Sequence, residues 1–268
     1  MIPDPDPSST CLVTGASSGI GAEFATQLAR LGHNVTLVAR REARLAALAG
    51  QLENAHGVAV AVEPCDLADS ARRDRLVAGL AERELAVELL VNNAGFAIVG
   101  DFWRKPEDQV EMVRLNAEAV VALTGAFLPA MVARGRGAVI NVASAAGFQP
   151  FPAQAVYGAT KAFVLSFTEA LAAELKGTGV TATALCPGPV ATEFTKKAGF
   201  RRSIDDFPSF ALSSPERIAR AGIRGARRGK RLVTPGFQVT SWSVVSRYSP
   251  RWLSSWFFAG PWRRIIGE

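Results

Sequence analysis

Three polar side chains have the types and the spacing of a proton-transfer site. Tyr157 and Lys161 stand four residues apart, and Ser144 lies thirteen positions upstream of the tyrosine. Residues i and i+4 of a helix share one face, so the phenol and the ammonium would point into the same space. The ammonium would favour the phenolate and lower the pKa of the phenol, which suits proton transfer near neutral pH. An ordinary helix with one buried tyrosine and one exposed lysine has the same pattern.

A glycine-rich turn near the N-terminus strengthens the functional interpretation. It joins the apolar run 10–14 to a segment with helical spacing that extends to residue 31. Its spacing is G-x-x-x-G-x-G; glycines let the backbone approach a pyrophosphate, and the following helix offers N–H groups at its N-terminus. The residues predicted to hold a dinucleotide here are Gly15, Ser17, Ser18, Gly19, Ile20 and Gly21.

Several motifs occur together in one order along residues 10–236: Thr14–Gly21, Asn92–Gly95, Asn116, Ser144, Tyr157, Lys161 and Pro187–Gly188. With these motifs in this order the chain resembles the short-chain dehydrogenase/reductase family. The resemblance implies an oxidoreductase of a single Rossmann-type domain; we expect a flexible leader (1–9) before it and an extension (237–268) after it.

The resemblance also implies a role for each catalytic position. Tyr157 would transfer the proton, and Lys161 would lower the pKa of Tyr157 and bind the nicotinamide ribose. Ser144 would orient the substrate carbonyl, and Asn116 would hold a water molecule in a proton relay with the lysine. Two plainer readings remain: Ser144 as a turn residue and Asn116 as an exposed residue of its helix.

Further cofactor contacts follow from the family's motifs. Asp66 would contact the adenine, although it could instead cap the next helix, and Thr192 would contact the carboxamide or cap a helix of the lid. The remaining positions of this kind are Leu67, Asn92, Ala94, Gly95, Pro187, Gly188 and Val190.

The end of the second predicted strand decides the choice of cofactor. An NAD enzyme places an acidic residue there, for the ribose 2′-hydroxyl. This chain has Ala39 followed by Arg40 and Arg41. Guanidinium groups pair with a 2′-phosphate, and Ser17 could add a hydroxyl. The sequence therefore predicts NADP(H) rather than NAD(H).

Apolar runs alternate with helical patterns from end to end, which predicts an α/β fold with a parallel sheet covered on both faces. The resemblance implies a doubly wound sheet of about seven strands in the order 3-2-1-4-5-6-7. Expected strands are 10–14, 34–39, 58–63, 88–91, 137–142, 180–186 and 231–234. Expected helices are 19–31, 42–55, 69–83, 106–133, 154–176 and 214–228.

The substrate side of the site is expected to be apolar. Residues 188–212 interrupt the strand–helix alternation with four phenylalanines and correspond to the family's substrate lid. Such a pocket suits an apolar ketone or alcohol, of ketoacyl, steroid-like or aromatic type. The predicted lining is Phe96, Ser144, Phe148, Phe151 and Phe194.

Composition narrows the class of protein further. The chain has 268 residues, of which 49% are hydrophobic and 20% charged, as in one large folded domain. Its three cysteines lie in or beside apolar runs and are expected to be small core residues in a reducing compartment. His33 and His56 lack metal-ligand spacing and are expected at the surface, so no metal site is expected. The net charge of +6 favours a solvated basic face; an acidic substrate carrier or an anionic membrane surface is an alternative, and no nucleic-acid-binding motif accompanies the charge.

The C-terminal extension leaves several roles open. It contains four of the five tryptophans, interleaved with arginines. The alternatives are a subunit contact, a wall of the pocket, or peripheral contact with a membrane. The family's default is a homodimer or homotetramer, and the expected location is the cytoplasm. A non-catalytic NADP-binding sensor or scaffold on the same fold is the main alternative function, and an epimerase or dehydratase would need a larger substrate domain.

Overall fold

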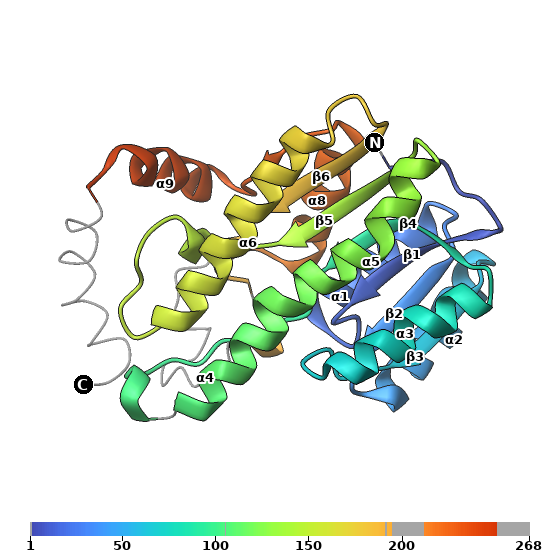
Figure 1. Cartoon of the computed structure of the whole chain (residues 1–268), viewed down its shortest axis with the longest axis horizontal. Coiled ribbons are helices and arrows are strands. Elements are labelled where there is room, and N and C mark those ends of the chain that lie inside the picture. Colours follow the sequence, from blue (N-terminus) through green and yellow to red (C-terminus); the bar gives the residue numbers. More distant parts are fainter. Residues whose placement is uncertain (1, 105, 191, 195–211, 251–268) are drawn as a thin grey trace.

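The computed structural model describes residues 2–104, 106–190, 192–194 and 212–250 (Figure 1). Within these residues the strands form one parallel sheet in the order β3-β2-β1-β4-β5-β6-β7, so the predicted doubly wound fold and its strand order are confirmed. The strands are β1 (Ser9–Thr14), β2 (Val35–Ala39), β3 (Val60–Pro64), β4 (Ala86–Asn92), β5 (Gly137–Val142), β6 (Val180–Leu185) and β7 (Leu232–Val233).

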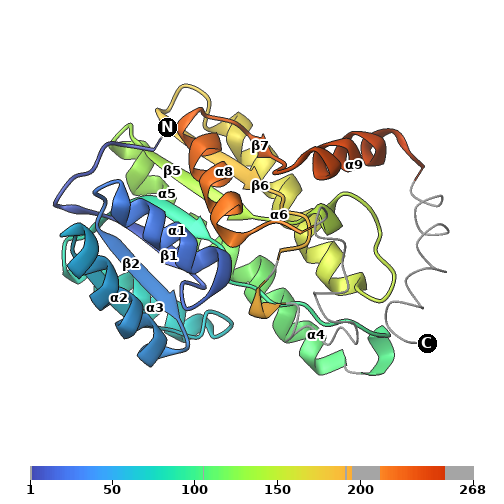
Figure 2. The ribbon, with the colours of Figure 1, turned by 180° about the vertical axis from the view of Figure 1, so that it is seen from behind.

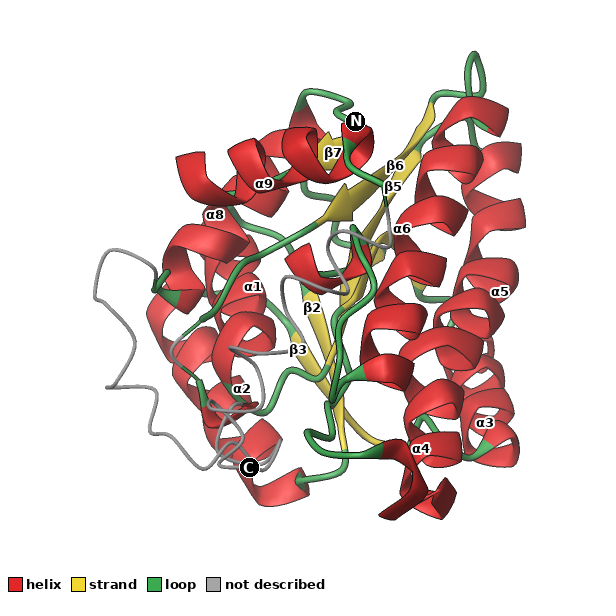
Figure 3. Ribbon diagram, turned by 90° about the vertical axis from the view of Figure 1, so that its left-hand side faces the viewer, coloured by secondary structure: helices red, strands yellow, loops and turns green. Residues whose placement is uncertain are grey.

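Helices cover both faces of this sheet, as the edge-on view in Figure 3 shows. Successive strand residues point to opposite faces. Val13 accordingly packs in one buried cluster with α1, α2 and α8, and Leu12 packs in another with α3, α5 and α6. The helices are α1 (Gly19–Arg30), α2 (Glu42–His56), α3 (Ser70–Glu82), α4 (Pro106–Val113), α5 (Ala119–Ala133), α6 (Ala155–Glu174), α8 (Pro215–Arg227) and α9 (Phe237–Tyr248).

The long helix expected over 106–133 is present but is not uniform. A π-helical turn, Arg114–Glu118, separates α4 from α5. Such turns occur often at functional sites, and this one contains Asn116. Pro106–Ala133 is also the one helix among the described residues with the length and apolar composition to cross a membrane. One such helix is weak evidence for a membrane span, because core helices of soluble proteins pass the same test; 44% of its most apolar window is buried inside the domain.

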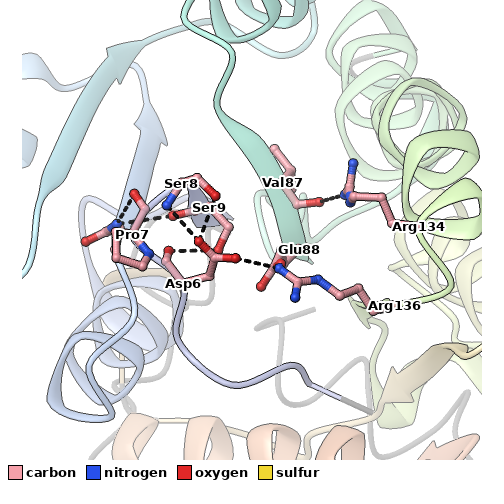
Figure 4. Close-up of polar contacts among 9 residues, drawn as sticks. Asp6, Pro7, Ser8, Ser9, Val87, Glu88, Arg134 and Arg136 are labelled. Carbon is pink, nitrogen blue, oxygen red and sulfur yellow. Dashed lines mark hydrogen bonds and ion pairs between the residues drawn. The ribbon is translucent and has the colours of Figure 1, made fainter.

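The segment before β1, expected to be a flexible leader, lies against the domain. Ile2 is buried, and the Asp6 carboxylate accepts hydrogen bonds from the Ser8 backbone N–H at 2.9 Å and the Ser8 hydroxyl at 2.7 Å. Arg136 pairs with Asp6 at 2.7 Å and also with Glu88, whose side chain is buried in β4 (Figure 4). These contacts fix the chain at the amino end of the sheet.

The expectation that His33 lies on the surface is wrong. The chain reverses at Gly32, which has φ = +88°, and the His33 N–H donates to the Leu28 carbonyl at 3.1 Å. This turn folds the imidazole inward until it is 4% exposed. Burial and the nearby Arg227 lower the pKa of His33, so the neutral form is favoured.

Candidate active site

A cavity of about 710 Å³ lies at the carboxyl ends of the strands. Its wall is built mainly from the segments that directly follow β1 to β6, with further residues from α6 and α9. Ligands of open parallel sheets bind at this edge, where the loops after neighbouring strands come together. The cavity is therefore where the fold would place a dinucleotide and its substrate.

The glycine turn forms one side of this cavity. Gly19 has φ = +59°, which favours glycine, and a Cβ on Gly21 would lie 2.3 Å from the Gly15 carbonyl oxygen. Ser18 is the N-cap residue of α1, but among the described contacts its side chain does not cap the helix and instead accepts a hydrogen bond from Arg41 at 2.7 Å. The first turn of α1 thus offers its backbone N–H groups to the cavity, as a pyrophosphate site requires.

Ser144, Tyr157 and Lys161 are brought together in the cavity wall. Tyr157 and Lys161 lie on α6 and are 8% and 5% exposed. The Lys161 Nζ donates to the Val142 carbonyl at 2.8 Å and lies 5.9 Å from the centre of the Tyr157 ring. Ser144 comes from the turn after β5, and its Oγ accepts from the Ala146 N–H at 3.1 Å.

The expectation that Lys161 lowers the pKa of Tyr157 is corrected by the burial of the tyrosine. Desolvation raises the pKa of the Tyr157 phenol to about 12, and a hydrogen bond with Ser144 opposes this only in part. Burial also lowers the pKa of Lys161 to about 8. The cost of burying a phenolate exceeds the benefit of a lysine whose Nζ lies 5.9 Å from the ring centre, so Tyr157 is protonated at neutral pH.

Asn116 lies behind the cavity wall rather than in it. Its Oδ1 accepts from the Phe96 N–H at 3.1 Å, and its Nδ2 donates to the Phe96 carbonyl at 2.8 Å and the Thr160 hydroxyl at 3.3 Å. The side chain is completely buried, so the plainer reading of an exposed residue is wrong. These bonds tie the loop after β4 to α6, one residue before Lys161.

The two arginines after β2 both line the cavity but have different partners. Arg41 donates to the Ser17 hydroxyl from Nε at 3.1 Å and from Nη2 at 2.9 Å, besides its bond to Ser18. Arg40 is more exposed and lies 3.7 Å from Asp66 and 3.9 Å from Glu111. Two guanidinium groups and a serine hydroxyl at the end of β2 fit a 2′-phosphate, and Arg41 is the better positioned of the two.

Most of the remaining predicted cofactor positions also line the cavity. Gly21 and Asn92 are exceptions within the described lining, because Gly21 packs on Gly15 and Asn92 bonds Thr124 and Asn141 inside the domain. The residues that do line it are Gly15, Ser17, Ser18, Gly19, Ile20, Arg40, Arg41, Asp66, Leu67, Ala94, Gly95, Pro187, Gly188, Val190 and Thr192.

The sequence left open whether Asp66 and Thr192 cap helices, and the structure answers differently for the two residues. Asp69, rather than Asp66, caps α3 by accepting from the Arg72 N–H at 3.2 Å. Thr192 does accept a hydrogen bond from the Phe194 N–H at 3.3 Å, while also lining the cavity.

On the substrate side, three of the four predicted phenylalanines line the cavity, namely Phe96, Phe151 and Phe194. The ring centre of Phe194 is 5.8 Å from that of Tyr157. Phe148 instead packs against a buried cluster around Val164. The later residues of the predicted lid, 195–211, lie outside the described residues.

Residues that the sequence did not single out complete the wall. Gln238, Val239 and Trp242 come from α9, which lies at the end of the domain toward which β5 and β6 point (Figures 1 and 2). The tryptophan-rich composition of the extension was the available signal, and pocket closure was one of its open alternatives. Glu193 also lines the cavity, between two predicted residues, and no motif marked it.

Comparisons with known proteins agree with this geometry. A model of the family described as short chain dehydrogenase matches residues 9–202. The very-long-chain 3-oxoacyl-CoA reductase of Laccaria bicolor is 41% identical over 175 residues, which are 63% of this chain and 51% of that relative. This chain therefore spans about half the length of that protein.

Two further proteins match over more of their own length. The NADP-dependent 3-hydroxy acid dehydrogenase of Salmonella typhi is 36% identical over 78% of this chain and 86% of its own. A solved short-chain dehydrogenase from Sphingobium yanoikuyae in complex with NADPH has a TM-score of 0.80 at 35% identity, and the match covers 89% of this chain and 92% of that one. The protein is thus a member of the short-chain dehydrogenase family.

Proposed function

We propose that this protein is an NADP(H)-dependent oxidoreductase that interconverts a ketone and a secondary alcohol. The observation that carries the proposal is that Ser144, Tyr157 and Lys161 line the same cavity as the glycine turn and Arg41. A proton donor and a dinucleotide site then face one space. The related enzymes named above, a 3-oxoacyl-CoA reductase and an NADP-dependent hydroxy acid dehydrogenase, support this reaction class.

Each residue has a defined part in the reaction. Bound NADPH supplies the hydride. Ser144 donates a hydrogen bond to the substrate carbonyl oxygen, and Tyr157 gives that oxygen its proton as negative charge develops there. Lys161 stabilises the phenolate that remains on Tyr157. Because burial keeps Tyr157 protonated at neutral pH, the arrangement supports reduction of the carbonyl. Asn116 holds the loop after β4 in place and so positions Lys161 through Thr160.

The cavity wall favours an apolar substrate. Phe96, Phe151 and Phe194 line it from the domain, and Val239 and Trp242 line it from α9. Apolar and aromatic walls with few polar groups are typical of pockets for hydrophobic ligands. The substrate class that fits is a ketone with a long-chain, ring or aromatic substituent, and α9 limits its size.

Self-association is a second part of the proposal. The helices α5 and α6 expose the apolar side chains Val121, Val132 and Phe163, and Phe163 stacks on Phe167 with ring centres 6.1 Å apart. A second copy of the chain would bury such a surface. Light scattering of the purified protein distinguishes a dimer or tetramer from a monomer.

The reaction is tested by following NADPH absorbance with a panel of ketones that differ in the size of their substituents. Turnover with bulky apolar ketones, and its loss in Tyr157→Phe, is the expected result. Tight NADPH binding without turnover of any ketone or alcohol would instead support the alternative of a non-catalytic NADP sensor.

A further inference from the structure

A carboxylate already pairs with Arg41, the arginine that is best positioned for the 2′-phosphate of the cofactor. Glu193, from the segment after β6, accepts a hydrogen bond from Arg41 Nη1 at 2.8 Å through Oε2. Through Oε1 it accepts one from Arg44 Nη1 at 2.7 Å. Arg41 directly precedes α2, and Arg44 lies in the first turn of that helix. The two guanidinium groups lower the pKa of Glu193 to about 2, so it is ionised at any working pH.

The residues on either side of Glu193 touch the other two parts of the site. Thr192 packs against the glycine turn, since a Cβ on Gly19 would lie 3.0 Å from its methyl carbon. Phe194 packs against Tyr157, with ring centres 5.8 Å apart. The segment 192–194 therefore contacts the glycine turn, Arg41 and the catalytic tyrosine.

We propose that Glu193 is an internal competitor for the 2′-phosphate of NADP(H). The carboxylate and the phosphate are both anions that pair with the Arg41 guanidinium group, and two such anions repel each other at short range. NADPH must therefore displace Glu193 from Arg41. NADH has no 2′-phosphate and leaves the contact in place.

The displacement has a consequence for segment 192–194. The ion pairs of Glu193 hold this segment on Arg41 and on Arg44 of α2, so their loss removes one of the contacts described above. Binding of NADPH, but not of NADH, then loosens segment 192–194, in which Phe194 packs against Tyr157. This inference depends on the proposed function, because it assumes that NADPH binds in the cavity.

The matched variants are Glu193→Gln, which keeps the shape of the side chain and removes its charge, and Glu42→Gln, which removes an exposed carboxylate adjacent to Arg41. Exposed ion pairs contribute little individually. For the loss of two, we expect Glu193→Gln to lower the Kd of NADPH by about three- to tenfold and to change that of NADH less than about twofold. Glu42→Gln should change neither Kd by more than about twofold. Fluorescence titration of the reduced cofactors measures all of these values.

Hydrogen exchange of the cofactor-free proteins gives a second readout. Backbone amides of residues 192–194 should exchange faster in Glu193→Gln than in wild type or Glu42→Gln, because the contact with α2 is lost. Unchanged exchange would show that the carboxylate does not hold the segment. NADPH binding that Glu193→Gln leaves unchanged or weakens would overturn the competition while leaving the proposed function intact. Wild-type protein that fails to bind NADPH at all would overturn both.

Discussion

The buried ammonium of Lys161 predicts a pH dependence of stability that can be calculated. Burial lowers the pKa of this group from 10.5 in the unfolded chain to about 8 in the folded protein. Between these values the unfolded state binds a proton that the folded state does not, so the free energy of unfolding rises with pH. From pH 8 to pH 10 the two pKa values give an increase of about 2 kcal/mol from this one group.

The measurement compares wild type with Lys161→Met, whose side chain is unbranched, one atom shorter and uncharged. Urea unfolding of both proteins, without cofactor, at several pH values between 7 and 10 gives the difference in their unfolding free energies. The free energy of unfolding of the wild type should therefore increase relative to that of Lys161→Met as the pH rises. The buried thiols of Cys11, Cys65 and Cys186 have raised pKa values that act in the opposite direction, but both proteins contain them and they largely cancel.

A difference that stays constant over this range would refute the reasoning. It would mean that the ammonium of Lys161 is hydrated or paired in the folded protein. The bond from Lys161 to the Val142 carbonyl would then not describe its environment, and neither would its burial in the wall of the cavity.

Three further predictions concern the reaction itself. Tyr157→Phe should lower kcat for ketone reduction by about 10²–10⁴-fold while the Kd of NADPH stays within about twofold, since only the phenol oxygen is lost; a kcat within tenfold of wild type would contradict its role as the acid. Arg41→Asp should weaken the binding of NADPH more than Arg40→Asp does, because Arg41 is the arginine that bonds the glycine-turn serines, and neither variant should change the binding of NADH as much. If the ratio of kcat/KM for NADPH to kcat/KM for NADH is the same in wild type and both variants, the phosphate assignment is refuted. Trp242→Ala should lower kcat/KM for bulky ketones about tenfold and affect small ones less, as a lost apolar wall contact would; an equal effect on both would argue against α9 as a wall of the pocket.

The sequence determined those features that depend on neighbours along the chain. A strand, a glycine turn and a helix follow one another within the first 31 residues, and backbone sterics allow few arrangements of such a unit. Tyr157 and Lys161 face the same space because four residues make one helical turn. The order of strands and helices then leaves a parallel sheet as the consistent solution, and the structure has that sheet.

Tertiary structure decided what depends on segments that are distant along the chain. The turn after β5 directs Ser144 into the cavity but places Phe148 in another cluster, and no spacing rule distinguishes these directions. The pKa of Tyr157 is set by how completely the surrounding segments exclude water, which a motif does not encode. Glu193 reaches Arg41 and Arg44 because the segment after β6 packs Thr192 against Gly19 of the glycine turn. Local spacing determines which groups share a face of a helix. Only the fold determines which other segments that face contacts and how completely water is excluded from it.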